Sequence, residues 1–236
     1  MTTVLAAPGS LVAGASVVLE PAEAHHLRVR RAASGEEIRL LDGQGALAQG
    51  RLRLGNEAVV EVETVHRMAR PASLTLAVGA GDRDRFLWLA EKAAELGVTD
   101  LLPLETERTA GVATRLRGDR LERLRNRARE ALKQCQTAWA PMVHEPMAIT
   151  EFVTVPRPGQ RWLASAGGEP PPPALDSSPV TVAIGPEGGF TAAETALLEG
   201  AGYHPVGLGN GVLRFETAAL AAAAIVGSAR QRGVRG

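Results

Sequence analysis

The first seventy residues alternate short apolar runs with glycine or Asp-Gly breaks. Runs that are rich in Val, Leu and Ile and bounded by turn residues are typical of short β-strands. The runs are SVVLE (16–20), EEIRLLDG (36–43), ALAQGRLRL (46–54) and EAVVEVETV (57–65). Together they predict a first domain over residues 1–70 that is a small β-barrel or sandwich.

Beyond this domain the hydrophobic pattern changes period. SLTLAVGAG (73–81) predicts a strand, and residues 82–97 carry apolar side chains at helical spacing, with Gly97 placed to end the helix. VTDLLPLET (98–106) again predicts a strand. Because strand, helix and strand in succession form a parallel α/β unit, the sequence predicts an α/β domain over residues 73–236.

A longer amphipathic segment from Asp119 to Gln136 predicts one helix. Its apolar stripe consists of Leu121, Leu124, Ala128, Ala131, Leu132 and Cys135. From Arg108 to Lys133 the chain has nine basic and three acidic residues, an excess of six positive charges in a protein of zero formal net charge. A solvated helix face explains such an excess, but so does a surface that binds nucleic-acid phosphates.

Val180 to Ile184 is a continuous apolar run, typical of a parallel strand that is covered on both faces. The bare loop Gly185-Pro186-Glu187-Gly188-Gly189 follows it. Thr191 and Glu194 then match a capping box, which predicts that a helix begins directly after Phe190. The glycine loop should therefore lie at the carboxyl end of a central strand, where open α/β sheets bind ligands.

Residues 202–220 repeat this order: a short strand, the loop Leu208-Gly209-Asn210-Gly211, and a helix. We expect the two glycine loops to enclose one pocket. The first loop contains Glu187 and no Lys or Arg, so it suits ribose hydroxyls or a cationic group better than a pyrophosphate. For the first loop taken alone, an ordinary tight turn between strand and helix is an equally good interpretation.

Composition narrows the class of protein. The single Cys135 excludes an internal disulfide framework and a multi-cysteine zinc site, and no cluster of metal-ligating residues is visible, so we expect no metal. No Lys or Arg precedes Arg28, which argues against a signal peptide, and no apolar run is long enough for a bilayer. We expect a cytoplasmic protein with no membrane segment.

The proline-rich residues 167–179 predict a stiff, exposed connector.

Five segments, in the same order along the chain, resemble those of the RsmE-type 16S ribosomal RNA (uracil-N3)-methyltransferases of the SPOUT class. They are HHLRVRRAASGEEIRLLDG (25–43), EKAAELGVTDLLPLETERT (91–109), REALKQC (129–135), IGPEGGFTAAE (184–194) and LGNGVLRFETAAL (208–220). The chain departs from the family pattern at four positions. Asn210 and Gly211 replace a Pro-Arg pair, Phe215 replaces a threonine, and Thr137 stands where an arginine is usual.

The resemblance implies a SPOUT-type C-terminal domain with a parallel sheet and a trefoil knot, preceded by a PUA-like domain that binds RNA. It implies S-adenosyl-L-methionine as cofactor, a homodimer, and N3 of a uridine in the 16S rRNA of the small ribosomal subunit as the methylated atom. Two alternatives stay open. One is another nucleotide-binding α/β enzyme, and the other is a noncatalytic RNA-binding or ribosome-assembly protein of the same fold.

The resemblance and the loops together suggest three sets of site residues. The cofactor-binding set is Leu163, Gly185, Pro186, Glu187, Gly188, Gly189, Leu208, Gly209, Val212 and Leu213. The RNA-binding set is Arg28, Arg31, Arg108, Arg120, Arg123 and Arg127. Arg214 and Glu216 are the catalytic candidates. Arg214 would stabilise a uracil anion, and Glu216 would orient it or take its proton. The alternative is that the two residues form an ion pair that closes the start of the helix.

Overall fold

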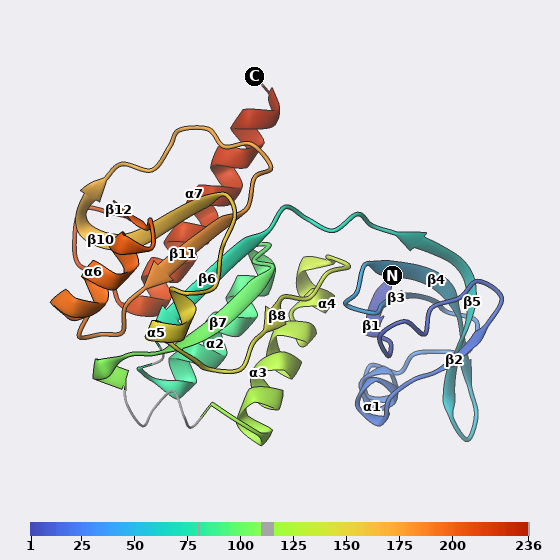
Figure 1. Cartoon of the computed structure of the whole chain (residues 1–236). Helices are drawn as coiled ribbons and strands as arrows, with labels where there is room; N and C mark the ends of the chain where they lie inside the picture. Colours follow the sequence, from blue (N-terminus) through green and yellow to red (C-terminus); the bar gives the residue numbers. More distant parts are fainter. Residues whose placement is uncertain (80, 110–115, 236) are drawn as a thin grey trace. The chain divides into compact units, whose positions relative to one another are not determined.

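The structure, a computed structural model, describes residues 1–79, 81–109 and 116–235, with the backbone alone for residues 234 and 235 (Figure 1). The chain divides into two compact units. The first contains Met1–Pro71 together with Glu130–Ala140, and the second contains Ala72–Arg129 and Pro141–Gly236. Arg115, counted in the basic segment, lies outside the described residues.

The first unit is built on a five-stranded sheet of order β1-β3-β4-β5-β2. The strands are β1 (Thr2–Leu5), β2 (Ser16–Val18), β3 (Glu37–Leu41), β4 (Ala46–Leu54) and β5 (Ala58–Arg67). β1 and β3 are parallel, and the other neighbours are antiparallel. Leu27 of helix α1 (Pro21–Val29) packs against Ile38 and Leu40 in the core. The four strands predicted from the sequence are confirmed.

Residues 130–140 are part of the first unit, although the sequence analysis placed them in the second domain. Leu132 and Ala138 are buried with Leu5 and Leu41, and the indole N–H of Trp139 donates to the Met68 carbonyl at 3.1 Å. The prediction of one helix over residues 119–136 is therefore wrong. Helix α3 (Asp119–Glu130) ends, and the short helix α4 (Leu132–Cys135) follows, because the two halves of the apolar stripe pack into different cores.

Lys133 of α4 is ion-paired with a buried carboxylate of the same unit. Its Nζ lies 2.8 Å from Oε1 of Glu23, whose side chain is 3% exposed. Lys133→Met removes the cation and keeps the stem, so we expect about 2 kcal/mol less protection in hydrogen exchange of peptides from the first unit. Glu130→Gln, at the exposed second partner of Lys133, is the control and should cost under about 0.5 kcal/mol. Equal losses in the two variants would contradict a role for the buried pair.

The same contact fixes a pH dependence. Burial by itself lowers the pKa of Lys133, but hydrogen bonds to Glu130 and Glu23 outweigh it, and the net pKa lies above the usual 10.5. A cation whose pKa is raised by folding stabilises fully below its unfolded pKa and loses that contribution as the pH rises through the folded value. The difference between wild type and Lys133→Met should thus stay constant from neutral pH upward, and shrink only beyond pH 10.5.

The second unit is built on a seven-stranded sheet of order β12-β10-β11-β6-β7-β8, with β9 also paired to β7. The strands are β6 (Leu74–Gly79), β7 (Asp100–Glu105), β8 (Met142–Val143), β9 (Met147–Ala148), β10 (Gln160–Glu169), β11 (Val180–Ile184) and β12 (His204–Val206). Every pair between these strands is parallel. The predicted parallel α/β arrangement, with residues 180–184 as a central strand, is confirmed.

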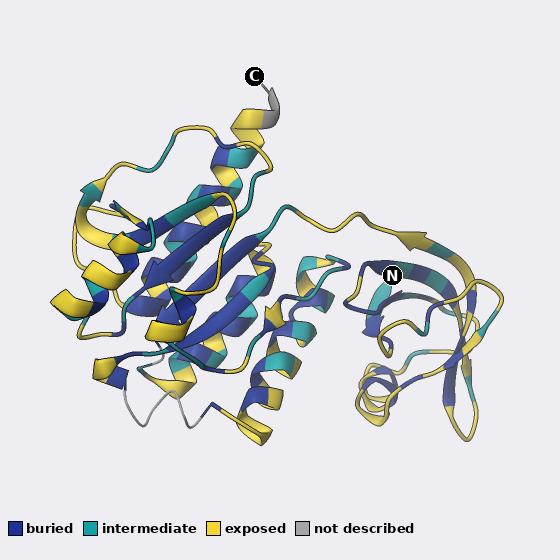
Figure 2. Cartoon of the chain, in the orientation of Figure 1, coloured by how far each residue is buried: buried dark blue, intermediate teal, exposed yellow. Residues whose placement is uncertain are grey.

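Helices cover both faces of this sheet. One face packs against α2 (Arg83–Glu95), α3 and α7 (Phe215–Arg235), and the other packs against α5 (Ile149–Phe152) and α6 (Ala192–Gly200). Figure 2 shows the central strands buried along their length between these layers. In the part of the chain that the structure describes, no helix is long and apolar enough to cross a membrane.

Local sequence explains where α2 begins and ends. The Asp82 carboxylate accepts the N–H groups of Asp84 and Arg85 at 3.0 and 2.9 Å, and Gly97 has a φ of +72° just after the helix, as predicted.

The predicted connector over residues 167–179 needs correction. β10 extends to Glu169, and Leu175 is buried, with its N–H donating to the Ala229 carbonyl of α7 at 3.1 Å.

Candidate functional site

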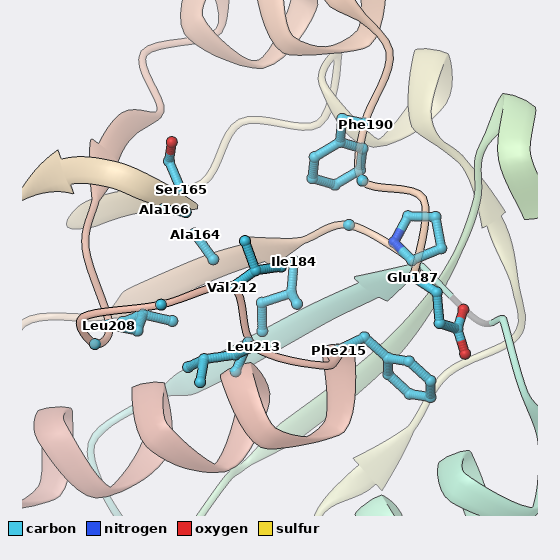
Figure 3. A pocket seen from close by; sticks show the side chains of 16 residues that line it. Ala164, Ser165, Ala166, Ile184, Glu187, Phe190, Leu208, Val212, Leu213 and Phe215 are labelled. Atoms are coloured by element: carbon cyan, nitrogen blue, oxygen red, sulfur yellow. The ribbon is translucent and has the colours of Figure 1, made fainter.

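Two glycine loops of the second unit meet at the carboxyl ends of its parallel strands (Figure 3). One follows β11, the other follows β12, and the last part of β10 lies beside them. They enclose a hollow of about 190 Å³. Its lining is Ala164, Ser165, Ala166, Ile184, Gly185, Pro186, Glu187, Gly189, Phe190, Leu208, Gly209, Gly211, Val212, Leu213, Phe215 and Ala218. The expectation that the two loops enclose one pocket is confirmed.

Most of the predicted cofactor-binding residues line this hollow. They are Gly185, Pro186, Glu187, Gly189, Leu208, Gly209, Val212 and Leu213. Leu163 does not line it, because its side chain is buried on the opposite face of the sheet, near Phe152 and Tyr203. Gly188 does not line it either. The residues missed from the sequence include Ala164 to Ala166 and Ile184. The end of the predicted strand of residues 180–184 could have indicated Ile184, whereas no strand was predicted around residues 164–166.

The first glycine loop lies very close to the end of β6. A Cβ built on Gly79 would lie 2.6 Å from Cδ and 2.7 Å from N of Pro186, so only glycine fits at this strand end. The Glu187 carboxylate lies close to Gly81. A contact from this carboxylate to a ribose stays a prediction.

Glu194 joins the start of α6 to the end of β7. Its Oε2 accepts the Thr191 N–H at 2.8 Å, and its own N–H donates to the Thr191 hydroxyl at 3.3 Å, which confirms the predicted capping box. Its Oε1 accepts the N–H of Glu107 at 2.8 Å. Glu107 begins the 3-10 helix η1 (Glu107–Thr109), so this one buried carboxylate fixes two segments that lie far apart in the sequence.

Glu194→Gln should lower the free energy of unfolding by about 1 to 2 kcal/mol, because one of its two oxygens becomes an amide donor that faces an N–H group. Urea unfolding followed by circular dichroism measures the change. Glu199→Gln, on the exposed surface of the same helix, is the matched control, with an expected change within about 0.5 kcal/mol. If both variants unfold alike, the bridging role of Glu194 is wrong.

The two catalytic candidates lie where the second loop joins α7. Arg214 is exposed, and its carbonyl accepts the N–H of Ala218 at 2.8 Å. Glu216 is 8% exposed, and its Oε1 lies 3.7 Å from Nη1 of Arg85. Its Oε2 has no hydrogen-bond partner among the described residues. Glu216 therefore pairs with Arg85 of α2, and the alternative of an Arg214–Glu216 pair is not what the structure has.

Several arginines of the basic segment are neutralised by acidic residues, some of them outside that segment. Arg117 lies 3.2 Å from Glu105, Arg125 pairs with Glu122 at 2.5 Å, and Arg127 pairs with Glu91. A hydrogen bond from Lys92, together with the charge of Arg127, lowers the pKa of Glu91 despite its partial burial. Arg83, Arg120 and Arg123 line a second hollow between α2 and α3.

The remaining predicted RNA-binding residues lie on other elements. Arg28 and Arg31 are exposed; Arg28 lies in α1, and Arg31 follows this helix with a φ of +57°. This short helix was not among the elements predicted from the sequence. Arg108 of η1 is also exposed, and its guanidinium donates to the Gly188 carbonyl. Among the described residues, no group of three or more potential metal ligands comes together.

The sequence matches two known domain families. Residues 68–227 match the family described as "RNA methyltransferase domain". Residues 19–63 match the one described as "RNA methyltransferase PUA domain". The first match covers more than half of the chain and includes both glycine loops.

Similar proteins agree with these matches. A protein from Synechocystis sp. named ribosomal RNA small subunit methyltransferase E is 32% identical over 219 residues, which cover 86% of this chain and 70% of the relative. The enzyme of that name from Rickettsia conorii is 29% identical over 226 residues, 88% of each chain.

Two solved structures are also similar. A ribosomal RNA small subunit methyltransferase E from Neisseria gonorrhoeae, bound to S-adenosyl methionine, has a TM-score of 0.81 at 29% identity and covers 95% of both chains. A methyltransferase from Legionella pneumophila in complex with the same cofactor has a TM-score of 0.79 at 27% identity, over 95% of this chain and 96% of the other. This chain therefore belongs to the RsmE-type family of RNA methyltransferases, with a PUA domain ahead of the methyltransferase domain.

Proposed function

We propose that this chain transfers a methyl group from S-adenosyl-L-methionine to N3 of a uridine in the 16S rRNA of the small ribosomal subunit. The observation that carries the proposal is the meeting of two glycine loops at one apolar hollow, in a chain of this family. Two similar solved structures contain the same methyl donor, which supports the assignment of the hollow.

The hollow fits the adenosyl part of the donor. Of the described residues that line it, none is Lys or Arg, so it suits a nucleoside without phosphates. Apolar side chains such as Ile184, Leu208 and Leu213 offer surface for a planar base, and the bare backbone of the glycines offers N–H and C=O groups for the base edge. We assign Gly185 to Gly189 and Leu208 to Leu213 as the cofactor-binding loops, with Leu163 supporting the end of β10 from behind.

The chemistry requires little from the protein beyond alignment. When bound, the donor supplies a methyl group already activated by a sulfonium. The chain must hold the acceptor base in line and remove the proton that N3 of uracil carries. N3 lies on the Watson–Crick edge, so the base has to be unpaired and accessible.

Arg214 and Glu216 are assigned to this step. Arg214 is exposed and follows Leu213, which lines the hollow, and we assign its guanidinium to the stabilisation of a uracil anion. Glu216 is held by Arg85, and its second carboxylate oxygen is buried without a hydrogen-bond partner among the described residues; we assign it as the group that accepts the proton.

RNA binding is assigned to arginines of both units. Arg120 and Arg123 line the hollow between α2 and α3, with Arg83 opposite them. Arg28 and Arg31 are exposed on the first unit, and Arg127 can contribute while it is paired with Glu91. Affinity for small subunits should fall with added salt, by about one unit of logarithmic slope for each phosphate contact.

The homodimer, the trefoil knot and the cytoplasmic location implied by the family resemblance belong to the same proposal. A dimer would bring two basic surfaces to one RNA. Light scattering of the purified chain tests the mass of the assembly.

The deciding experiment is transfer of tritium from labelled S-adenosyl-L-methionine to small subunits that lack the modification. We expect label in uridine methylated at N3, identified by nucleoside mass spectrometry, and none in subunits already modified there. Free 16S rRNA, assayed in parallel, shows which form is the substrate. If calorimetry detects donor binding but no label enters N3, the chain is a noncatalytic binding protein. If NAD or ATP binds in place of the donor, it is a different nucleotide-binding enzyme.

A further inference from the structure

Two adjacent residues of η1 hold the first glycine loop, about 80 positions away in the sequence. The Arg108 guanidinium donates to the carbonyl of Gly188. The backbone N–H of Glu107 donates to Oε1 of Glu194, 2.8 Å away, at the point where the loop enters α6. η1 directly follows β7, so the loop is attached to an element fixed by the sheet.

The hydrogen bond from Arg108 orients a particular peptide group. The Gly188 carbonyl and the Gly189 N–H belong to the same planar peptide and point in opposite directions. The carbonyl accepts from Arg108, and the N–H donates to the Pro186 carbonyl at 2.7 Å. Both ends of this peptide are therefore held, directly before Gly189 and Phe190, which line the hollow.

Gly188 leaves room for the arginine. A Cβ at Gly188 would lie 2.9 Å from Cδ of Arg108. Unlike Gly189, whose φ is +69°, Gly188 does not have a left-handed backbone conformation that would itself favour glycine. What glycine provides at position 188 is thus space for the Arg108 stem.

We propose that Arg108 is a positioning residue of the methyl-donor site, which orders the loop of residues 185–190, and that this role replaces the RNA contact predicted from its charge. The proposal rests on the proposed function of the hollow. Without Arg108 the Gly188 carbonyl loses a charge-assisted hydrogen bond, and the loop has to be ordered when the donor binds. Donor affinity should fall, while affinity for RNA should not.

Calorimetry with S-adenosylhomocysteine, the demethylated product, tests this role without relying on turnover. We expect Arg108→Ala to weaken binding about tenfold. Arg108→Lys should recover part of the loss, because an ammonium can also donate to one carbonyl. Gly188→Ala displaces the arginine stem and should weaken binding as well. The double variant Arg108→Ala, Gly188→Ala should bind the product no less tightly than the single variant with the lower affinity. The two losses should not add, because both changes act on one contact.

Arg123→Ala is the matched control for loss of an exposed positive charge. It should leave the affinity for the product within about twofold of wild type and weaken binding to small subunits. Arg108→Ala should instead weaken binding of the product and leave binding to small subunits unchanged. In steady-state kinetics, Arg108→Ala should raise KM for the methyl donor and leave KM for the RNA substrate unchanged. Hydrogen exchange in the peptide that covers residues 185–190 should become faster in Arg108→Ala.

The outcomes separate the two proposals. If wild type binds the product and Arg108→Ala binds it equally well, the positioning role is wrong and the proposed function stands. The positioning role is also wrong if Arg108→Ala weakens only the binding of small subunits. If wild type itself does not bind the product, the proposed function fails and this role fails with it.

Discussion

Replacing Gly79 by alanine is expected to lower methyl transfer on the order of 100-fold. The added methyl group would lie 2.6 Å from Cδ of Pro186, and β6 and β11 are neighbouring parallel strands, so the strand end and the glycine loop cannot both keep their places. Overpacking of this kind should also lower the free energy of unfolding by about 2 kcal/mol. Labelled-methyl transfer and urea unfolding measure the two effects.

Gly227→Ala is the control for Gly79→Ala. Gly227 lies within α7, and nothing is within 4 Å of a Cβ built on it. Alanine there should leave transfer unchanged and stabilise the helix by up to about 1 kcal/mol. Full activity in Gly79→Ala would show that the loop tolerates displacement, which would contradict the close fit of the site.

Arg230→Met should destabilise the second unit by about 3 kcal/mol. The Arg230 guanidinium of α7 donates to three carbonyls, those of Ala72 at 2.9 Å, Ser73 at 2.7 Å and Ser178 at 2.9 Å. Burial lowers its pKa, with the charge of Asp176 opposing, but an arginine stays charged at neutral pH. These carbonyls precede β6 and β11, so the methionine variant would remove a donor at the start of both strands, and the Ser73 carbonyl would keep the N–H of Val180 at 3.0 Å.

Arg232→Met provides the comparison. Arg232 also donates to a carbonyl, that of Pro173 at 2.5 Å, but it is exposed, so water can replace it and the loss should be within about 0.5 kcal/mol. Urea unfolding of both variants, with hydrogen exchange in peptides from β6 and β11, measures the difference. An Arg230→Met variant as stable as Arg232→Met would contradict the bridging role.

Much of the fold could be predicted because it depends on patterns that are local in the sequence. The strand of residues 180–184 and its capped helix follow from an apolar run and from Thr191 and Glu194, three residues apart. The order of strands and helices predicted the parallel sheet, and parallel strands bring their carboxyl ends to one edge. Most of the lining of the hollow was therefore predictable from the two loops.

The helix predicted over residues 119–136 shows what such local patterns cannot predict. Its apolar spacing continues through Ala131, but the spacing carries no information about which core each half enters. The positive charge of the same segment could be counted, yet its acidic partners could not be identified. Glu91 and Glu105 lie earlier in the chain and reach Arg127 and Arg117 only in the folded state.

The sequence by itself determined the kinds of elements, the two glycine loops and the family of the chain, because hydrophobic period, capping and turn chemistry act over a few neighbouring residues. Only the tertiary structure decided that Glu216 faces Arg85, that Arg108 holds Gly188, and that residues 130–140 belong to the first unit. Each of these depends on groups tens of residues apart, whose meeting is set by the packing of whole layers.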